Sequence, residues 1–315
     1  MKKAPDFASD FADIFKEYVE FMINLGRNFR VETTILRAFD RYLIQQNIDE
    51  ITETAAVEFT YSVINLSKAQ YDKRHRIIRK FSEYLALRHE TPTVRPLPQK
   101  DIPKRHIAYV YTDDELGLIL DEAKKLNPVP KLRPHTFYTL LGLLASTGMR
   151  ISEAINLDVN DIDFKNGIIK IKNTKFRKSR LIPVHKTTLA VLKKYDKLRR
   201  ELITNPKDNA FFLNKYKLRL KYANVNDVFL QIIRKLNIRS KSGNGARIHD
   251  IRHVFAIRRI ASWYDMGLDI HQMLPLLSTY MGHAHFEDTV YYLNAGAELL
   301  AKGAERFNKG GDMNG

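Results

Sequence analysis

The feature that most constrains the fold is a proline-rich stretch near residue 100. Between Glu90 and Lys104 the sequence ETPTVRPLPQKDIPK holds four prolines and no apolar periodicity. Because proline is disfavoured inside helices and sheets, such a segment is typical of an extended linker. A chain of 315 residues is long enough for a core on each side of it. The predicted parts are a first domain at residues 1–90, a linker at 91–108, a second domain at 109–295 and a tail at 296–315.

Residues before the linker carry a helical pattern. Between Phe7 and Leu87 no proline occurs, and apolar residues recur at helical spacing, as at Phe11, Phe15 and Tyr18. This periodicity predicts four or five packed helices.

Helical patterns also surround a single β region beyond the linker. Thr112 and Glu115 predict a capping box at the start of a helix. An Asn166-Gly167 turn, followed by alternating Ile and Lys at residues 169–172, predicts a small antiparallel hairpin sheet. The predicted fold class is therefore mainly α with a small antiparallel β-sheet, in which a helical domain precedes a mixed α/β domain.

The charge of the chain indicates a polyanionic partner. Its formal charge is +16 and its isoelectric point is near 9.7. Nucleic acid is the usual partner of such a chain, because clustered Lys and Arg release counterions from phosphates.

Two basic stretches predict where nucleic acid would lie. Residues 68–85 place cations beside an apolar helix face, although a merely solvated face is an equally good interpretation. Between Ile168 and Ile182 the sequence holds six Lys or Arg and no acid. The predicted DNA-contacting residues are Lys73, Arg74, Arg76, Arg79, Lys80, Lys172, Arg177, Lys178 and Arg180.

Other classes of protein are disfavoured. No run of apolar residues approaches the eighteen needed to cross a membrane, and the N-terminus turns acidic where a signal peptide would turn apolar. The chain has no cysteine, which excludes disulfides, thiolate chemistry and Cys-ligated zinc. His283 and His285 lack a well-spaced carboxylate partner, so a metal site is not expected. We predict a soluble, cytoplasmic protein.

One stretch has the composition of an active site. The run HDIRH at residues 249–253 puts His249, Arg252 and His253 on neighbouring parts of one helical face. Arg offers a planar fork of donors and His can transfer a proton near neutral pH, so this face would suit a phosphate. Arg150 stands at a Thr-Gly break between two helical patterns, beside a predicted core.

With these motifs the chain resembles the tyrosine recombinase family, also called phage integrases. The order matches from Thr112 to Leu293: Arg150 in TGMRISE, Lys175 in the basic hairpin, the HDIRH run, Gly-His at 282–283, and then a tyrosine. The resemblance implies a helical core-binding domain that clamps DNA, a catalytic domain, and no metal or cofactor. The implied catalytic residues are Arg150, Lys175, His249, Arg252, His283 and Tyr292, supported by Glu153.

The resemblance also implies roles. Arg150 and Arg252 would hold the scissile phosphate and Lys175 would protonate the leaving 5′ oxygen, with Lys172 and Lys178 as weaker candidates. His249 would assist proton transfer and His283 would hydrogen-bond the phosphate. Tyr292 would form the 3′-phosphotyrosyl intermediate, with Tyr291 and then Tyr280 as its competitors.

Partners and alternatives follow from the same resemblance. The expected partner is double-stranded DNA with a specific short site, bound by a homo-oligomer: a dimer on each site and a tetramer in synapsis. The tail at 296–315 would dock on a neighbouring protomer. The alternatives are an inactive DNA-binding regulator of the same fold, a type IB topoisomerase, and a basic helical module for RNA or membranes. Delivery of Tyr292 in cis or in trans stays open.

Overall fold

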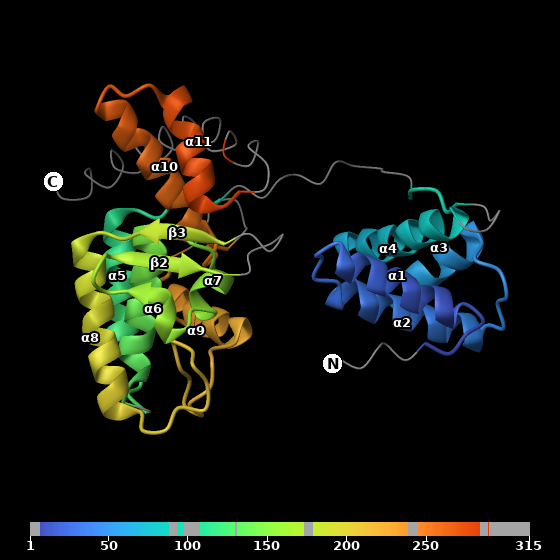
Figure 1. Ribbon diagram of the computed structural model, residues 1–315, viewed down its shortest axis with the longest axis horizontal. Helices are drawn as coiled ribbons and strands as arrows, with labels where there is room; N and C mark the ends of the chain where they lie inside the picture. The colour runs from blue at the N-terminus through green and yellow to red at the C-terminus, as the bar shows by residue number, and fades with distance from the viewer. Residues whose placement is uncertain are drawn as a thin grey trace. The chain divides into compact units, whose positions relative to one another are not determined.

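The chain folds into two compact units, Met1–Lys104 and Arg105–Gly315, in a computed structural model (Figure 1). The structure describes residues 7–87, 93–97, 108–129, 131–172, 179–238, 245–283 and 289. The two units are described separately below.

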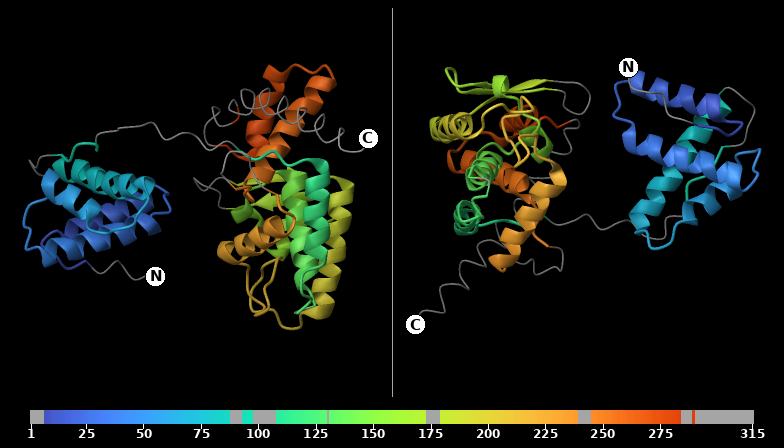
Figure 2. Two further views of the ribbon diagram at one scale, coloured as in Figure 1. Left: turned by 180° about the vertical axis from the view of Figure 1, so that it is seen from behind. Right: turned by 90° about the horizontal axis from the view of Figure 1, so that it is seen from below.

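The first unit is a bundle of helices around an aromatic core (Figures 1 and 2). Its helices are α1 (Ala12–Asn24), α2 (Arg30–Gln45), α3 (Glu53–Tyr61) and α4 (Lys68–Ala86). Phe15, Phe39 and Phe81 are fully buried, and the Phe15 and Phe81 rings stack with centroids 4.2 Å apart. The helical spacing of the aromatic residues therefore did predict the buried faces of these helices.

A short segment of the predicted linker packs on this bundle. Val94 is 3% exposed and its N–H donates to Ser82 Oγ at 2.9 Å. His75 Nε2 lies 2.7 Å from the Arg95 carbonyl oxygen. Residues 93–97 form neither helix nor strand, and these contacts belong to the first unit.

The second unit combines helices with a small sheet. Its helices are α5 (Asp113–Lys124), α6 (Arg133–Thr147), α7 (Ile151–Ile155), the 3-10 turn η1 (Val159–Asp161), α8 (Lys186–Leu202), α9 (Tyr222–Lys235), α10 (Asp250–Asp265) and α11 (Ile270–Met281). The sheet has the order β1 (Ile162–Asp163), β2 (Ile168–Ile171) and β3 (Arg180–Pro183), and all neighbours are antiparallel. The predicted fold class is confirmed. The predicted Asn166-Gly167 turn lies between β1 and β2, and Gly167 has a positive φ of 69°.

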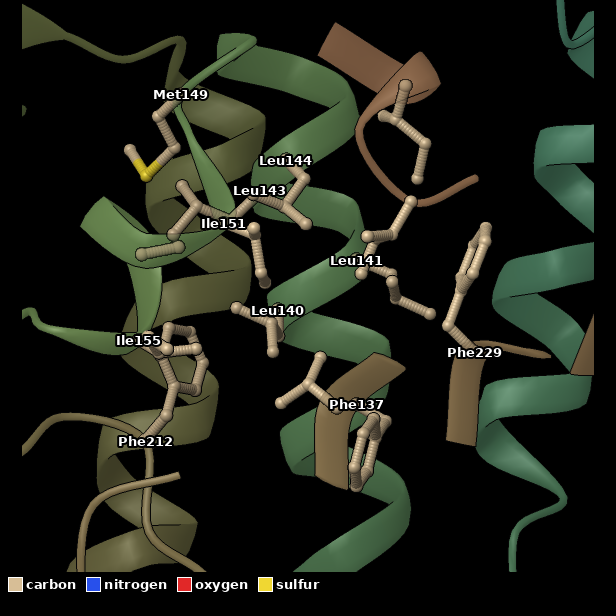
Figure 3. Packing of buried hydrophobic residues seen from close by; sticks show 14 of the residues in the cluster. Phe137, Leu140, Leu141, Leu143, Leu144, Met149, Ile151, Ile155, Phe212 and Phe229 are labelled. Carbon is tan, nitrogen blue, oxygen red and sulfur yellow. The ribbon is translucent and has the colours of Figure 1, made fainter. Parts of the chain in front are cut away.

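Helix α6 runs through the core of this unit. Leu140, Leu141, Leu143 and Leu144 are all at most 2% exposed, and they form a broad buried face of the helix (Figure 3). Helices α5, α10, α8 and α7 pack against it. Figure 3 also shows cluster residues from α7, the loop before α9 and α9, namely Ile155, Phe212 and Phe229. This packing gives the C-terminal end of α6 a defined position.

Local sequence signals set the ends of two other helices. The predicted capping box at α5 is confirmed, since Thr112 Oγ1 accepts from the Glu115 N–H and Glu115 accepts from the Thr112 N–H. The segment before His283 forms the end of α10 and all of α11, joined by a turn at Gly267. Within the described part of the chain, no helix combines the length and the apolar character needed to cross a membrane.

Candidate active site

The site begins at the break between α6 and α7. Gly148 ends α6 with a left-handed backbone (φ +61°), a conformation that glycine adopts without steric cost. Met149 and Ile151, on either side of Arg150, are buried in the α6 cluster (Figure 3). Arg150 is the N-cap of α7, and Glu153 accepts from both its backbone N–H and its Nη1 at 2.9 Å. Its neighbours are thus anchored while its guanidinium leaves the core.

A second arginine comes from the first turn of α10. Arg252 is 3% exposed, and its Nη1 donates to the Gly148 carbonyl at 2.7 Å. Its Nη2 donates to the Met281 carbonyl at 2.8 Å. A buried cation must be matched by hydrogen-bond acceptors, and these two carbonyls provide them. Arg252 therefore links the end of α6 to the end of α11.

A third arginine, Arg180, comes from β3. Its Nε donates to the Tyr280 carbonyl at 2.8 Å, and its two Nη atoms donate to the Glu153 oxygens at 2.9 and 2.8 Å. The side chain is 11% exposed. Arg180 was predicted to contact DNA, and in the structure its donors are engaged inside the protein.

These arginines cap the C-terminus of α11. The carbonyls of Tyr280, Met281 and Gly282 accept from Arg180, Arg252 and Arg150 respectively. The last carbonyls of a helix have no partner within the helix, and cations are favourable at this end of the helix dipole. The end of α11 and the three guanidinium groups consequently hold one another in place.

The helix end presents His283 to this cluster. Its N–H donates to the Ser278 carbonyl at 3.1 Å, and its Nδ1 lies 2.6 Å from Thr289 Oγ1. Burial, followed by the charges of Arg252 and Arg150, lowers the pKa of His283 to about 3. The imidazole is therefore neutral at physiological pH.

Two more histidines lie at the start of α10. His249 is the N-cap residue, and its ring meets that of His253 edge to face at 5.1 Å. Shielding from solvent, followed by the charge of Arg252, lowers the pKa of His249. Shielding likewise lowers the pKa of His253 to about 4. Both rings are thus neutral near pH 7. The charge of Arg150 contributes to the lowered pKa of His249 and to that of His283.

Glu153 carries the negative charge of the cluster. Burial would raise its pKa, but hydrogen bonds and charges from Arg180 and Arg150 outweigh burial and lower it. One ionised carboxylate faces three arginines and neutral histidines, so two positive charges are in excess. Such a site suits a phosphate, especially when further negative charge develops on it.

The structure brings together most of the predicted catalytic set. Arg150, Glu153, His249, Arg252 and His283 come from α7, α10 and the end of α11, and they form one cluster. The remaining members of the prediction lie outside the described residues, and these are Lys175, Arg177, Lys178, His285, Tyr291 and Tyr292.

Two of the weaker candidates have structural partners. Lys172 forms an ion pair with Asp161, and the hydrogen bond to this carboxylate raises the pKa of Lys172. Tyr280 stacks on Phe255 with centroids 5.8 Å apart, and burial raises the pKa of its phenol. Neither arrangement favours a role in the chemistry.

The basic face of α4 divides into anchored and solvent-facing cations. Arg74 Nη2 donates to the Phe59 carbonyl at 2.8 Å, and its guanidinium lies over the Phe59 ring. Arg79 pairs with Glu83 on the same helix. Arg76 and Lys80 are exposed one turn apart, and Lys73 is half-buried.

The sequence did not predict the residues that support the cluster. Arg180 was assigned to DNA because it lies in the basic stretch between Ile168 and Ile182, and its acceptors Glu153 and Tyr280 are distant in sequence. A Cβ atom at Gly148 would overlap the Phe255 ring, and one at Gly282 (φ +69°) would lie 2.6 Å from Arg180 Nη1. The available signal was a glycine at each helix end, immediately before His283 and two residues before Arg150.

Comparison with known proteins identifies the family. The sequence profile of the phage integrase family matches residues 110–298. The chain is 36% identical to a proposed integrase/recombinase, y4rE, of Sinorhizobium fredii over 97% of this chain and 98% of the relative. It is 25% identical to tyrosine recombinase XerA of Pyrococcus horikoshii, over 94% of this chain and 93% of the relative.

Solved structures share the fold. The XerH recombinase bound to a palindromic difH substrate superposes with a TM-score of 0.62 at 21% identity, covering 89% of this chain and 79% of that one. A lambda integrase dimer bound to a COC′ core site gives 0.61 at 14% identity, covering 89% and 94%.

The mainly helical fold carries a cluster of arginines and neutral histidines that suits a phosphate. The chain belongs to the phage integrase family, and it is a site-specific recombinase of the tyrosine class.

Proposed function

We propose that this recombinase cleaves and rejoins DNA by transferring a DNA phosphate to Tyr292, with Arg150, Arg252, His249, His283 and Lys175 as the other catalytic residues. The observation that carries the proposal is the cluster at the ends of α6 and α11. There Arg252 and Arg150 donate to the consecutive carbonyls of Met281 and Gly282. The neutral His249 and His283 lie in the same cluster.

The arginines would act on the transition state. Attack on a phosphodiester places extra negative charge on the oxygens around phosphorus, and fixed cations offset it without reorganising. Loss of one such preorganised donor costs about 10²–10³ in rate in a well-studied enzyme. With this stabilisation supplied by guanidinium groups, no metal ion is required in the proposed mechanism.

The proton transfers follow from the protonation states. Tyr292 Oη attacks phosphorus, and its proton passes to neutral His249. The bond from phosphorus to the 5′ oxygen breaks, and that oxygen takes a proton from Lys175. The new phosphotyrosyl bond keeps the phosphodiester's energy, so a 5′ hydroxyl can reverse the steps on a new strand without ATP.

Assembly on DNA is part of the proposal. The XerH and lambda integrase structures are described as complexes with DNA sites, and the latter as a dimer. The charge of +16 supports the same partner for this chain. We propose that a dimer binds each short site, that two sites pair in a tetramer, and that residues 296–315 link protomers. Deleting these residues should weaken assembly on paired sites; unchanged assembly would contradict that role.

The nucleophile is tested by trapping. A random-sequence duplex pool is incubated with the protein in EDTA, and DNA that remains attached after denaturation is recovered and cloned. A nicked duplex carrying the selected site should then accumulate a covalent adduct. Tyr292→Phe should abolish the adduct and the matched Tyr291→Phe should retain it. Absence of any adduct would favour the inactive-regulator alternative.

The general acid is tested by the leaving group. Lys175→Ala should slow cleavage strongly on ordinary DNA, but much less on a duplex whose bridging 5′ oxygen is replaced by sulfur, because a thiolate leaves without a proton. Equal losses on both substrates would refute this role. Lys178→Ala provides the matched control from the same hairpin.

A further inference from the structure

We infer that Arg180 is a positioning residue for strand cleavage, which acts through Glu153 and the end of α11 to keep Arg150 and His283 aimed at the phosphate. The inference rests on the proposed function. It assigns to Arg180 a contribution to catalysis without contact with DNA.

The first observation is the shared carboxylate. Glu153 accepts two hydrogen bonds from Arg180, at 2.9 and 2.8 Å, and two from Arg150, both at 2.9 Å. Arg180 thus occupies acceptor positions that a single buried carboxylate would otherwise offer to Arg150. With this pairing in place, Arg150 Nη2 reaches the Gly282 carbonyl at 2.7 Å.

Removing Arg180 changes this balance. Glu153, 9% exposed, would keep its charge with one guanidinium partner in place of two. Arg150 is the nearest cation, and planar guanidinium groups favour bidentate pairing with carboxylates. We expect Arg150 to turn toward Glu153 and to lose its alignment with the phosphate.

The second observation is the contact with Gly282. Arg180 Nε donates to the Tyr280 carbonyl at 2.8 Å. A Cβ atom at Gly282 would lie 2.6 Å from Arg180 Nη1 and 2.8 Å from its Cζ. The guanidinium therefore covers the left-handed residue that directly precedes His283, and it fixes the direction in which His283 leaves α11.

Direct phosphate binding by Arg180 does not fit these contacts. Its side chain is 11% exposed, and its Nε and both Nη atoms donate to protein acceptors. Lys170 on the neighbouring strand β2 is exposed, and it provides a matched loss of positive charge from the same sheet.

The test uses the full-length chain and the nicked duplex selected above. Dissociation constants and single-turnover cleavage rates at saturating protein are measured for wild type, Arg180→Gln, Arg180→Lys, Lys170→Gln, Arg150→Ala and two double variants. Arg180→Gln should lower the cleavage rate about 10²-fold, since misplacing a catalytic group by about 1 Å can have such an effect. The salt dependence of DNA binding by Arg180→Gln should equal that of the wild type. Arg180→Lys should recover about tenfold, because Lys restores the charge without the planar fork.

Two double variants separate positioning from general damage. Adding Glu153→Gln to Arg180→Gln removes the unpaired carboxylate, so it should restore part of the lost rate, about tenfold. Adding Arg180→Gln to Arg150→Ala should lower the rate less than about threefold, because the effect of Arg180 passes through Arg150. The inference is overturned if the rate losses of Arg180→Gln and Arg150→Ala multiply fully in their double variant. It is also overturned if Glu153→Gln restores none of the rate lost in Arg180→Gln.

The remaining outcomes are also decisive. If the salt slope of binding falls by about one for Arg180→Gln, Arg180 binds phosphate and the inference is wrong. If Arg180→Gln does not fold, Arg180→Lys carries the same test, and a wild-type rate would overturn the inference. A wild-type chain that forms no adduct through Tyr292 contradicts the proposed function. A normal adduct with unaffected Arg180 variants contradicts only this inference.

Discussion

Gly148 joins the core to the active site, and its backbone leaves no room for a side chain. Its φ is +61°, and a Cβ atom there would overlap the Phe255 ring. We predict that Gly148→Ala lowers the free energy of unfolding by about 2–3 kcal/mol, from the left-handed backbone and the overlap together. Thermal or urea unfolding of the full-length protein measures this.

The control is a glycine in an open position. Gly117 lies inside α5, and a Cβ atom there would meet nothing within 4 Å. Gly117→Ala should leave stability unchanged or raise it by up to about 1 kcal/mol, because alanine favours helices. A loss of stability equal to that of Gly148→Ala would show that the backbone at Gly148 is not the cause.

The neutral histidines predict a dependence of stability on pH. Shielding from solvent holds the pKa of His253 at about 4 and that of His283 at about 3, both below the usual value of about 6.5. Between about pH 6.5 and pH 4 the unfolded chain therefore binds more protons than the folded chain, and stability present above pH 6.5 is lost as the pH falls. For His253 the loss is up to about 3 kcal/mol.

This dependence is checked by thermal unfolding between pH 7.5 and pH 4.5. The unfolding temperature should fall with pH, and His253→Asn, which cannot take up the proton, should flatten the decline. The exposed His271 on α11 offers the matched substitution His271→Asn, which should leave the slope unchanged. An unfolding temperature that rises on acidification would contradict the prediction.

DNA binding should raise the pKa values of these histidines. Burial, followed by the charges of Arg252 and Arg150, lowers the pKa of His283, and a bound phosphate would offset the two charges. We predict net proton uptake on binding near pH 6, measured by calorimetry in buffers of different ionisation enthalpy. The uptake should shrink in His283→Gln, and uptake that is absent in wild type would contradict a phosphate beside His283.

At the scale of elements, α4 carries two kinds of cation, of which one is anchored in the fold and the other faces solvent. Arg74 is anchored on Phe59, whereas Arg76 and Lys80 are exposed on one side of the helix. We predict that replacing Arg76 and Lys80 by Ala weakens DNA binding and lowers its salt slope by about one for each residue. Arg74→Ala should instead lower the stability of the first unit.

Binding measured at several salt concentrations provides the check. Lys193 and Lys194 are exposed on α8 and provide a matched pair of alanine substitutions on another helix. If the pair on α8 lowers the affinity and the salt slope as much as the pair on α4, the effect comes from net charge and not from a DNA-facing helix.

Elements were more predictable than the contacts between them. Periodicity and capping signals depend on neighbouring residues, so they predicted the helices and the α5 capping box. The burial of Val94 and the partners of Arg180 depend on residues 12 to 100 positions away, which no local pattern contains. The candidate catalytic residues could be proposed because their order follows a family pattern, but the arginines that cap α11 could not.

At the scale of the whole molecule, each unit has its own core. Phe15, Phe39 and Phe81 belong to a cluster confined to the first unit, and Leu140 and Phe229 to a cluster confined to the second. The candidate catalytic cluster lies entirely in the second unit. We therefore propose that the first unit contributes to DNA binding. The cleavage rate should depend on this unit only through the fraction of protein that has DNA bound.

Separating the units should consequently affect affinity far more than chemistry. Two binding units on one chain bind with an effective concentration that can raise affinity about 10²–10⁴-fold over either alone. We predict that residues 105–315, expressed without residues 1–104, bind the selected duplex at least about 10²-fold more weakly than the full chain. At saturating protein their cleavage rate should stay within about tenfold of the full chain, because the fragment keeps the cluster at the ends of α6 and α11.

Circular dichroism first establishes that each fragment folds. A full-length variant with a short Gly-Ser insertion between residues 98 and 107 is the control, since the entropy of closing a longer loop rises only slowly with its length. It should bind within a few-fold of wild type. A fragment 105–315 that binds as tightly as the intact chain would show that the first unit does not hold DNA. A fragment that binds at saturation but does not cleave would show that the first unit takes part in assembling the site.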